Sequence, residues 1–154
     1  MTKNNSGTNI IATNRKARHL YEFLDTVEAG IVLVGPEVKS LREGKVSFKD
    51  SFVFFRGREA WISGLYIAPY GNAGYAQPDT ERERKLLLHV SEINSLAARV
   101  EQKGLTLVPW KMYFKNGKVK VEVALGKGKK LYDQREDLKR RAEDRDTARE
   151  MSRY

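Results

Sequence analysis

The chain has 154 residues, of which 40% are hydrophobic and 32% are charged, a composition typical of a soluble one-domain globular protein rather than a disordered chain. Lys and Arg number 29 against 20 Asp and Glu, and the resulting net charge of +9 favours a polyanionic partner such as nucleic acid. Cysteine is absent, which excludes disulfides, thiolate metal sites and thiol catalysis, and every apolar run is far shorter than the roughly 20 residues of a membrane span.

Composition divides the chain into three segments. Residues 1–9 are polar and contain no apolar secretion signal, so we interpret them as a flexible arm of a cytoplasmic protein. Residues 10–126 alternate apolar runs with turn signals, as a folded domain does. Residues 127–154 contain ten Lys or Arg and seven Asp or Glu among sparse apolar residues. This predicts a basic tail that is disordered when free and helical on a polyanionic surface, with a merely solubilising tail as the alternative.

The first part of the domain reads as short strands and one short helix. We predict strands over residues 18–26 and 31–34, broken near Glu28-Ala29-Gly30. We predict a helix over residues 37–43, because Gly44 fits the glycine that often ends a helix.

A hairpin is expected in the middle of the domain. Residues 52–55 and 61–67 are rich in aromatic and β-branched side chains, which favour strands, and Arg56-Gly57-Arg58 lies between them as a turn. Gly64 interrupts the second strand and indicates a bulge or a tight bend, as at the corner of a barrel.

A helix is predicted over residues 84–103, where apolar residues recur at steps of three and four and Gly104 marks the end. Ser91 is a candidate cap for a second segment of this helix. A narrow apolar stripe does not accommodate three consecutive residues, so one leucine of the run Leu86-Leu87-Leu88 is expected to point away from the core.

The pair Asn116-Gly117 is the strongest turn signal, because Asn-Gly between alternating residues is typical of a two-residue hairpin. Pairing outward from this turn places four cross-strand pairs on one buried face: Phe114 with Val119, Met112 with Val121, Trp110 with Val123, and Val108 with Leu125. The opposite face carries Lys111, Tyr113, Lys115, Lys118, Lys120 and Glu122. This basic face is either a solvated surface or a surface that contacts RNA, and the pattern alone leaves both open.

Several short strands with few helices must hide their edges, and closure into a barrel achieves this. We therefore predict a mainly β fold: an oligonucleotide-binding-like antiparallel barrel of five or six strands, with flanking helices and a basic C-terminal tail.

The sequence contains no phosphate-binding glycine loop, nucleophile elbow or metalloprotease motif, so we expect no enzyme activity, cofactor or metal site. The carboxylates of Asp25 and Glu28 form too weak a pair to support a hydrolase. Basic residues, in contrast, cluster beside tyrosines and predict salt-dependent RNA binding. These clusters are Arg15-Lys16-Ala17-Arg18, then Lys39, Arg42, Lys45 and Lys49, and then Arg82, Arg84 and Lys85.

Three stretches, together with Asn14, Ala17 and Tyr21, resemble the SmpB (SsrA-binding protein) family in order and spacing. They are Glu28-Ala29-Gly30-Ile31-Val32-Leu33 continuing to Glu37-Val38-Lys39-Ser40-Leu41-Arg42, then Arg84-Lys85-Leu86-Leu87-Leu88-His89, and finally Gly126-Lys127-Gly128-Lys129-Lys130 with Asp133 and Arg135. The resemblance extends from about Asn14 to the C-terminus.

The resemblance implies a non-catalytic adaptor for ribosome rescue. Such a protein binds the tRNA-like domain of transfer-messenger RNA and delivers it, with elongation factor Tu as an indirect partner, to stalled ribosomes for trans-translation. The tail would enter the vacant message channel near the decoding centre and become helical there. We expect a monomer that contacts no membrane. The alternative function is a structural ribosomal or architectural nucleic-acid-binding protein.

Family motifs and basic patches together define the candidate site residues. The RNA-binding candidates are Glu28, Lys39, Arg42, Arg84, Lys85, Leu87, His89, Lys118 and Lys120. The candidates in the ribosome-binding tail are Lys127, Gly128, Lys129, Lys130, Tyr132, Asp133, Arg135 and Arg145.

Overall fold

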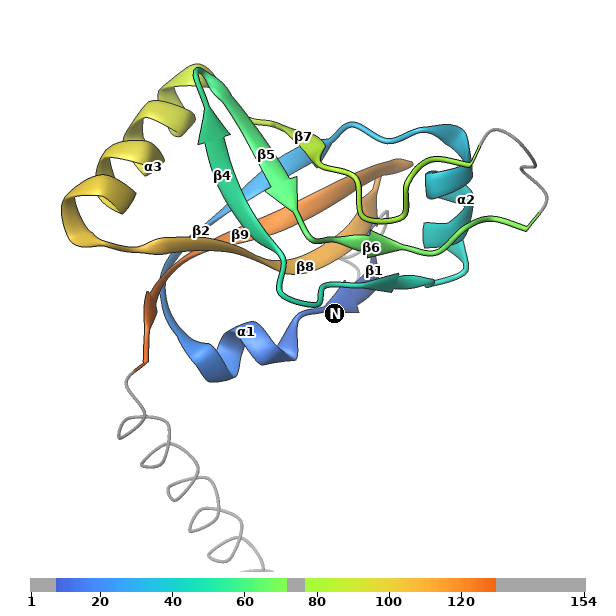
Figure 1. Ribbon diagram of the computed structural model, residues 1–154, viewed down its shortest axis with the longest axis horizontal. Helices are drawn as coiled ribbons and strands as arrows, with labels where there is room; N and C mark the ends of the chain where they lie inside the picture. Colours follow the sequence, from blue (N-terminus) through green and yellow to red (C-terminus); the bar gives the residue numbers. More distant parts are fainter. Residues whose placement is uncertain (1–7, 72–76, 130–154) are drawn as a thin grey trace, which may run out of the picture.

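The computed structural model describes residues 8–71 and 77–129, and all structural statements below refer to them. A closed antiparallel barrel forms their centre (Figure 1). Its strands pair in the order β8, β4, β5, β7, β2 and β9, and β9 pairs again with β8. The strands are β2 (Tyr21–Ile31), β4 (Phe52–Arg56), β5 (Glu59–Ser63), β7 (Arg84–Leu87), β8 (Thr106–Lys115) and β9 (Lys118–Gly128). The predicted oligonucleotide-binding-like barrel is confirmed.

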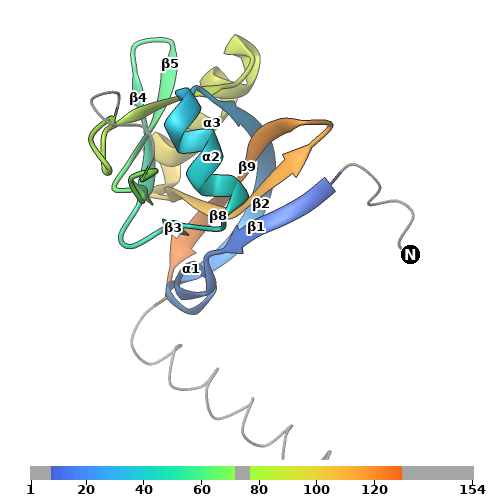
Figure 2. The ribbon, with the colours of Figure 1, turned by 90° about the vertical axis from the view of Figure 1, so that its right-hand side faces the viewer.

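Further elements surround this ring. Strand β1 (Thr8–Thr13) pairs with the outer half of β8, beside the β8–β9 hairpin (Figure 2). Strands β3 (Val46–Ser47) and β6 (Tyr66–Ile67) form a separate small sheet. Helices α1 (Arg15–Leu20), α2 (Gly35–Arg42) and α3 (Val90–Lys103) lie at different places around the outside (Figure 1). Helices α2 and α3 correspond to flanking helices that the sequence predicts, whereas α1 was not predicted.

The barrel interior is filled by aliphatic side chains from every strand of the ring. Each fully buried aliphatic side chain stabilises the fold by about 1.5–3 kcal/mol, so this interior is the main source of stability. Its buried members include Ala29, Val53, Ile62, Leu86, Met112, Val121, Val123 and Leu125.

The strand predicted over residues 18–26 begins as a helix instead. The Asn14 side chain accepts a hydrogen bond from the Ala17 amide (3.3 Å) and donates one to the Pro109 carbonyl (2.8 Å), so it both caps α1 and ties it to β8. Ala17 is buried in a small hydrophobic cluster with Val108 and Ala124 on the outer face of the barrel. Because of this cap and cluster, the extended chain starts only at Tyr21.

The break predicted near Glu28-Ala29-Gly30 is also wrong. Strand β2 is continuous to Ile31, and Gly30 pairs with Leu87 of β7 in the ladder. The missing side chain at Gly30 serves a close approach, because a Cβ atom there would lie 3.2 Å from the Leu87 Cβ. The strand predicted over 31–34 is correct only at Ile31, since the following residues lead into α2.

The three glycine signals predicted between residues 44 and 64 are confirmed. Helix α2 ends at Arg42 and is followed by Gly44, whose φ is 72°. Strands β4 and β5 pair around a two-residue turn at Gly57 and Arg58. Gly64, with a φ of 81°, forms the expected bend after β5.

The helix predicted over 84–103 is two elements. Residues Arg84–Leu87 form strand β7, in which side chains alternate between buried and outward positions, and the helix proper begins at Val90. Ser91 is not its cap. The N-cap residue is His89, whose amide donates to a Glu92 carboxylate oxygen at 3.0 Å. Leu87 is 54% exposed, which confirms that one leucine of the run points away from the core.

The β8–β9 hairpin follows the predicted register only near its turn. The pairs Phe114–Val119 and Met112–Val121 are confirmed. The pairs Trp110–Val123 and Val108–Leu125 are wrong, because a bulge falls between Pro109 and Lys111 and shifts the register by one residue. Proline cannot donate to the ladder and is tolerated in a sheet at such a bulge. The shift turns Val108 and Trp110 outward, onto the small cluster beside α1.

The folded part of the chain extends beyond the boundaries expected for the domain. Thr8 and Asn9 lie in β1 rather than in an arm, and Lys127 and Gly128 continue β9 opposite Glu22 and Tyr21. The Lys129 amide then donates to the Leu20 carbonyl (2.9 Å). The other predicted tail residues, namely Lys130, Tyr132, Asp133, Arg135 and Arg145, lie outside the described residues.

Candidate nucleic-acid interface

A groove of about 540 Å³ opens on the outside of the barrel where β2, β7, β9 and the start of α3 meet. It brings together residues that are far apart in the sequence. The RNA-binding candidates that line it are Glu28, Lys85, Leu87, His89 and Lys120. Arg58, Glu59 and Glu92 line it as well. The groove therefore combines cations, an exposed leucine and carboxylates.

Backbone pairing builds the floor of the groove. Leu87 of β7 lies opposite Gly30 of β2, and Lys120 of β9 lies opposite Gly30 on its other side. The glycine lets Leu87 approach the strand closely while leaving its side chain largely in solvent. Val90, at the first turn of α3, is 48% exposed beside it. The result is a small apolar surface with a cation next to it.

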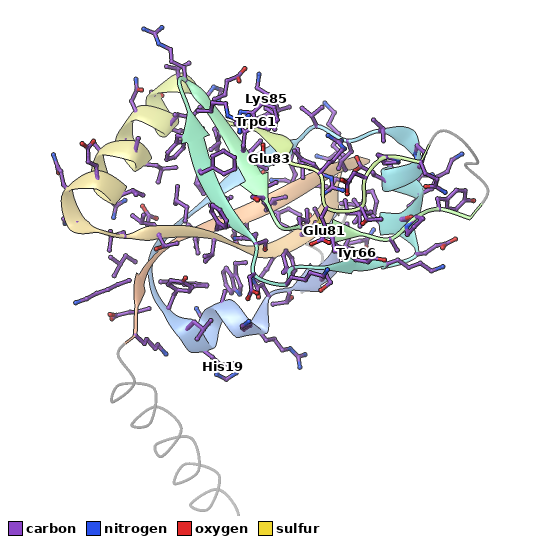
Figure 3. The ribbon with its side chains drawn as sticks, in the orientation of Figure 1. His19, Trp61, Tyr66, Glu81, Glu83 and Lys85 are labelled. Atoms are coloured by element: carbon purple, nitrogen blue, oxygen red, sulfur yellow. The ribbon has the colours of Figure 1, made fainter. Side chains whose placement is uncertain are left out.

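Lys85 and Arg58 supply positive charge from the β5–β7 side. The Lys85 ammonium lies 2.9 Å from a Glu59 carboxylate oxygen, and both side chains are partly exposed. Such a surface ion pair is weak, so Lys85 can exchange its carboxylate for a phosphate at little cost. Figure 3 shows Lys85 beside Trp61 over β5 and β7, on the opposite side of the molecule from His19 on α1.

Glu28 is held on the other side of the groove by two residues of β8. The Tyr113 hydroxyl donates to Glu28 Oε2, and the Lys115 ammonium lies 3.4 Å from the same oxygen. The hydrogen bond from Tyr113 lowers the pKa of Glu28, burial partly opposes it, and Lys115 and Lys120 lower it further. Glu28 is therefore ionised at neutral pH and accepts hydrogen bonds only.

Arg84 does not belong to this interface, although the sequence pattern made it a candidate. Its side chain is fully buried, and its Nε donates to Glu37 Oε2 of α2 at 2.7 Å. The same guanidinium donates to the carbonyls of Leu65 (2.7 Å) and Thr80 (3.1 Å). A guanidinium with all these partners anchors α2 and the loop after β6 to β7, so Arg84 is structural.

Opposing effects act on the pKa of Glu37, the carboxylate that binds Arg84. Burial alone raises the pKa of Glu37, but hydrogen bonds from Arg82, the Val34 amide and Arg84 outweigh it, and the pKa is lowered overall. Arg82 completes the pair from a more exposed position, 2.7 Å from Glu37 Oε1. Glu37 is 45 residues or more from either arginine, and no local pattern in the sequence could have predicted this cluster.

The remaining candidates lie elsewhere on the surface. Lys39 and Arg42 are exposed on α2, and the Lys39 ammonium lies 5.5 Å from the centre of the Tyr70 ring. Lys118 is exposed at the end of the β8–β9 hairpin, next to the groove but outside its lining. Lys127 and Lys129 lie beside the end of α1. The structure thus separates the predicted cations into a groove and more distant patches.

A cation–aromatic cluster beside α1 was missed by the sequence analysis. The Arg18 guanidinium lies 5.1 Å from the ring centres of both Phe23 and Trp110, and the Lys111 ammonium lies 4.1 Å from Trp110. The rings of Phe23 and Trp110 meet edge to face at 5.5 Å. Pro109 is the sequence signal that could have indicated this cluster. A proline within a strand often marks a bulge, and the bulge beside Pro109 turns Trp110 outward.

The two carboxylates considered for a hydrolase do not form a common site. Asp25 is paired with Arg99 at 3.0 Å, whereas Glu28 is bound by Tyr113 and Lys115. In the described part of the chain, His, Asp and Glu residues form no group of three that could hold a metal ion. Within the same residues, no helix is long and apolar enough to cross a membrane.

Comparison with known proteins points to one family. The family described as "SmpB protein" matches residues 11–153. The SsrA-binding protein of Nitratidesulfovibrio vulgaris (strain DP4) is 65% identical over 154 residues, covering 100% of both chains. The SsrA-binding protein of Oleidesulfovibrio alaskensis is 61% identical, covering 99% of this chain and 98% of the relative.

A solved structure shares the fold as well. It is described as "tmRNA-SmpB: a journey to the center of the bacterial ribosome", and its matching chain is 51% identical with a TM-score of 0.69. The match covers 84% of this chain and 94% of the other.

Proposed function

The chain belongs to the SmpB family, and on that premise we propose that it binds the tRNA-like domain of transfer-messenger RNA and delivers it to stalled ribosomes for trans-translation. One observation carries the proposal: the barrel gathers Glu28, Leu87 and His89, the positions that the family resemblance links to RNA, into one groove with Lys85 and Lys120. The protein would act in the cytoplasm as a monomeric, non-catalytic adaptor, with elongation factor Tu as an indirect partner.

The chemistry of the groove suits a folded RNA. Lys85 and Lys120 offer positive charge to phosphates, and binding of this kind releases counterions and weakens with salt. The exposed Leu87 offers an apolar surface to a ribose or to the face of an unstacked base. Glu28 offers an acceptor to ribose hydroxyls or base amino groups, which distinguish RNA surfaces from bare phosphate. A groove that mixes these groups recognises a shaped RNA surface rather than charge alone.

The proposal gives the C-terminal residues a separate task. Lys127, Gly128 and Lys129 are attached to the barrel through β9 and the Leu20 carbonyl, so this part of the predicted tail belongs to the folded domain. We assign residues 130–154 to the message channel and decoding centre, where ribosomal phosphates would organise them into a helix. RNA capture and action on the ribosome would then depend on different parts of the chain.

Truncation after Lys129 tests this division of labour. The shortened protein should bind a transcript of the tRNA-like domain with unchanged affinity, because the groove and the β9 ladder remain intact. The same truncation should abolish tagging of nascent chains on ribosomes stalled at the end of a truncated message. The matched control is Leu87→Ser in the full chain, which should lose RNA capture and therefore tagging as well.

Two outcomes would contradict the proposal. If truncation removed RNA capture, the groove would not be the main binding site. If the full-length protein bound the tRNA-like domain no better than other structured RNA and stayed in washed ribosomal subunits, a structural ribosomal or architectural role would replace the adaptor.

A further inference from the structure

We propose that Tyr113 is a positioning residue for RNA recognition, acting through Glu28, an inference that rests on the proposed function. Tyr113 is 8% exposed and does not line the groove, whereas Glu28 does. The Tyr113 hydroxyl donates to Glu28 Oε2. This hydrogen bond connects a buried side chain behind the groove to a carboxylate on the surface that would meet RNA.

The strand register explains how the two side chains meet. Glu28 lies opposite Glu122 of β9, and Tyr113 lies opposite Lys120, two residues earlier on the same strand. Glu28 and Tyr113 therefore come from the two strands that flank β9, on the outer face of the barrel, and reach each other diagonally across it. This arrangement depends on β8, β9 and β2 being adjacent in the sheet.

Tyr113 fixes a side chain that would otherwise be mobile. An exposed glutamate on a strand samples many rotamers, and ordering it on binding costs free energy. Here Oε2 is occupied by Tyr113, and Lys115 lies 3.5 Å from Oε1, so the carboxylate is oriented before RNA arrives. The free acceptor positions of Oε1 remain for a donor from RNA.

The charges around Glu28 also matter, because a carboxylate near phosphates is repelled unless it is compensated. Lys115 and Lys120 compensate it, while Glu122 on β9 adds the opposite sign. Burial raises the pKa of Tyr113, and its contact with Glu28 raises it further. The phenol therefore stays protonated at every working pH and remains a hydrogen-bond donor, never a competing anion.

The substitution Tyr113→Phe removes only the hydroxyl and tests the inference with the full-length chain and a transcript of the tRNA-like domain. Affinity should fall by about threefold to tenfold, the range expected for the loss of one typical hydrogen bond. The matched control is Tyr66→Phe on β6, outside the groove, which should bind like the wild type. In a double-mutant cycle, Tyr113→Phe should add nothing in a Glu28→Gln background, because it acts only through that carboxylate.

A second readout does not depend on RNA. Carbon-13 NMR titration of the Glu28 carboxyl should show a higher pKa in Tyr113→Phe than in the wild type, because the largest cause of its depression is gone. Should Tyr113→Phe fail to fold, Lys115→Gln at the half-exposed neighbouring position removes the other partner. It should also lose part of its affinity in a manner that depends on Glu28.

The outcomes are distinct. If the wild type binds the transcript selectively while Tyr113→Phe binds equally well, or loses affinity additively with Glu28→Gln, the positioning role is overturned and the proposed function stands. If the wild type shows no preference for the tRNA-like domain, both are overturned.

Discussion

At the scale of single residues, neighbours in the sequence have opposite roles. Arg84 is fully buried against Glu37, whereas Lys85 points into the groove and is paired only with the partly exposed Glu59. Strand alternation causes this difference, because successive side chains of β7 lie on opposite faces. A basic run such as Arg82-Glu83-Arg84-Lys85 is thus not a uniform RNA-binding patch, and each cation must be judged by its burial.

The contrast predicts opposite phenotypes for two matched substitutions. Arg84→Met removes one of the two arginine partners of the buried Glu37 carboxylate and leaves the Leu65 and Thr80 carbonyls without their donor. It should lower the free energy of unfolding by about 3–5 kcal/mol. Lys85→Met breaks an exposed pair and should change stability by less than about 1 kcal/mol, while weakening RNA binding. Urea denaturation and RNA titration measure both. Equal stability losses, or normal RNA affinity in Lys85→Met, would refute this assignment.

At the scale of elements, Gly64 controls how the chain leaves β5. Its φ is 81°, and a Cβ atom there would lie 3.2 Å from the Ser51 Cα, which belongs to the backbone and cannot easily yield. Gly57, in the β4–β5 turn, also has a positive φ of 66° but has open space around it. Substituting each glycine in turn therefore distinguishes the cost of backbone strain, which both positions share, from the cost of steric crowding, which arises only at Gly64.

Alanine at these two positions should have unequal effects. Gly57→Ala carries only the strain of the left-handed conformation and should destabilise the fold by about 1 kcal/mol. Gly64→Ala adds a backbone clash and should cost about 2–4 kcal/mol. Thermal or urea unfolding of both variants checks the order. Equal costs would mean that the Ser51 segment moves freely.

The β8–β9 hairpin makes a quantitative prediction about phosphate contacts. Lys120 lines the groove and Lys118 lies beside it, so Lys118→Gln and Lys120→Gln together should flatten the dependence of log affinity on log salt. Each true phosphate contact contributes roughly 0.7–0.9 to that slope. Lys103→Gln, at the far end of α3 from His89, is the control and should leave it unchanged. An unchanged slope in the hairpin variant would make its basic face a solvated surface.

The elements also show what sequence patterns could and could not predict. Asn116-Gly117 correctly gave the hairpin and its first pairs, and Gly44, Gly57 and Gly104 marked real ends or turns, because these signals are local. The register beyond Trp110 failed because one proline-associated bulge reverses which side chains face inward. Strand β7 was mistaken for helix because four residues are too few to separate the two periodicities.

In the candidate site, too, contacts between residues far apart in the sequence could not be predicted from local patterns. Glu28, Leu87 and His89 were placed by resemblance to a family, and the structure brings them to one groove, which no spacing in the sequence could predict. The burial of Arg84 could not be predicted, because its partner, Glu37, lies 47 residues away in the sequence. Tyr113 was seen on the outer face of the hairpin, but its contact with Glu28 requires the closure of the sheet through β9.

At the scale of the whole molecule, one closed barrel carries cations on separated surfaces. The groove is lined by β2, β7, β9 and the start of α3. Helix α1 and the end of β9 lie on the opposite side of the barrel from β7 (Figure 1). A net charge of +9 attracts any RNA, so charge alone does not identify the partner. Selectivity must come from the mixed chemistry of the groove.

The central claim is that this groove selects one RNA, and cross-linking in the native cells tests it most directly. RNA cross-linked to the wild-type protein and to Leu87→Ser would be recovered and sequenced. Leu87 is 54% exposed, so its replacement leaves the core intact. We expect the tRNA-like domain of transfer-messenger RNA to dominate the wild-type cross-links and to be lost in Leu87→Ser. Cross-links spread over ribosomal RNA and unchanged by the substitution would contradict it.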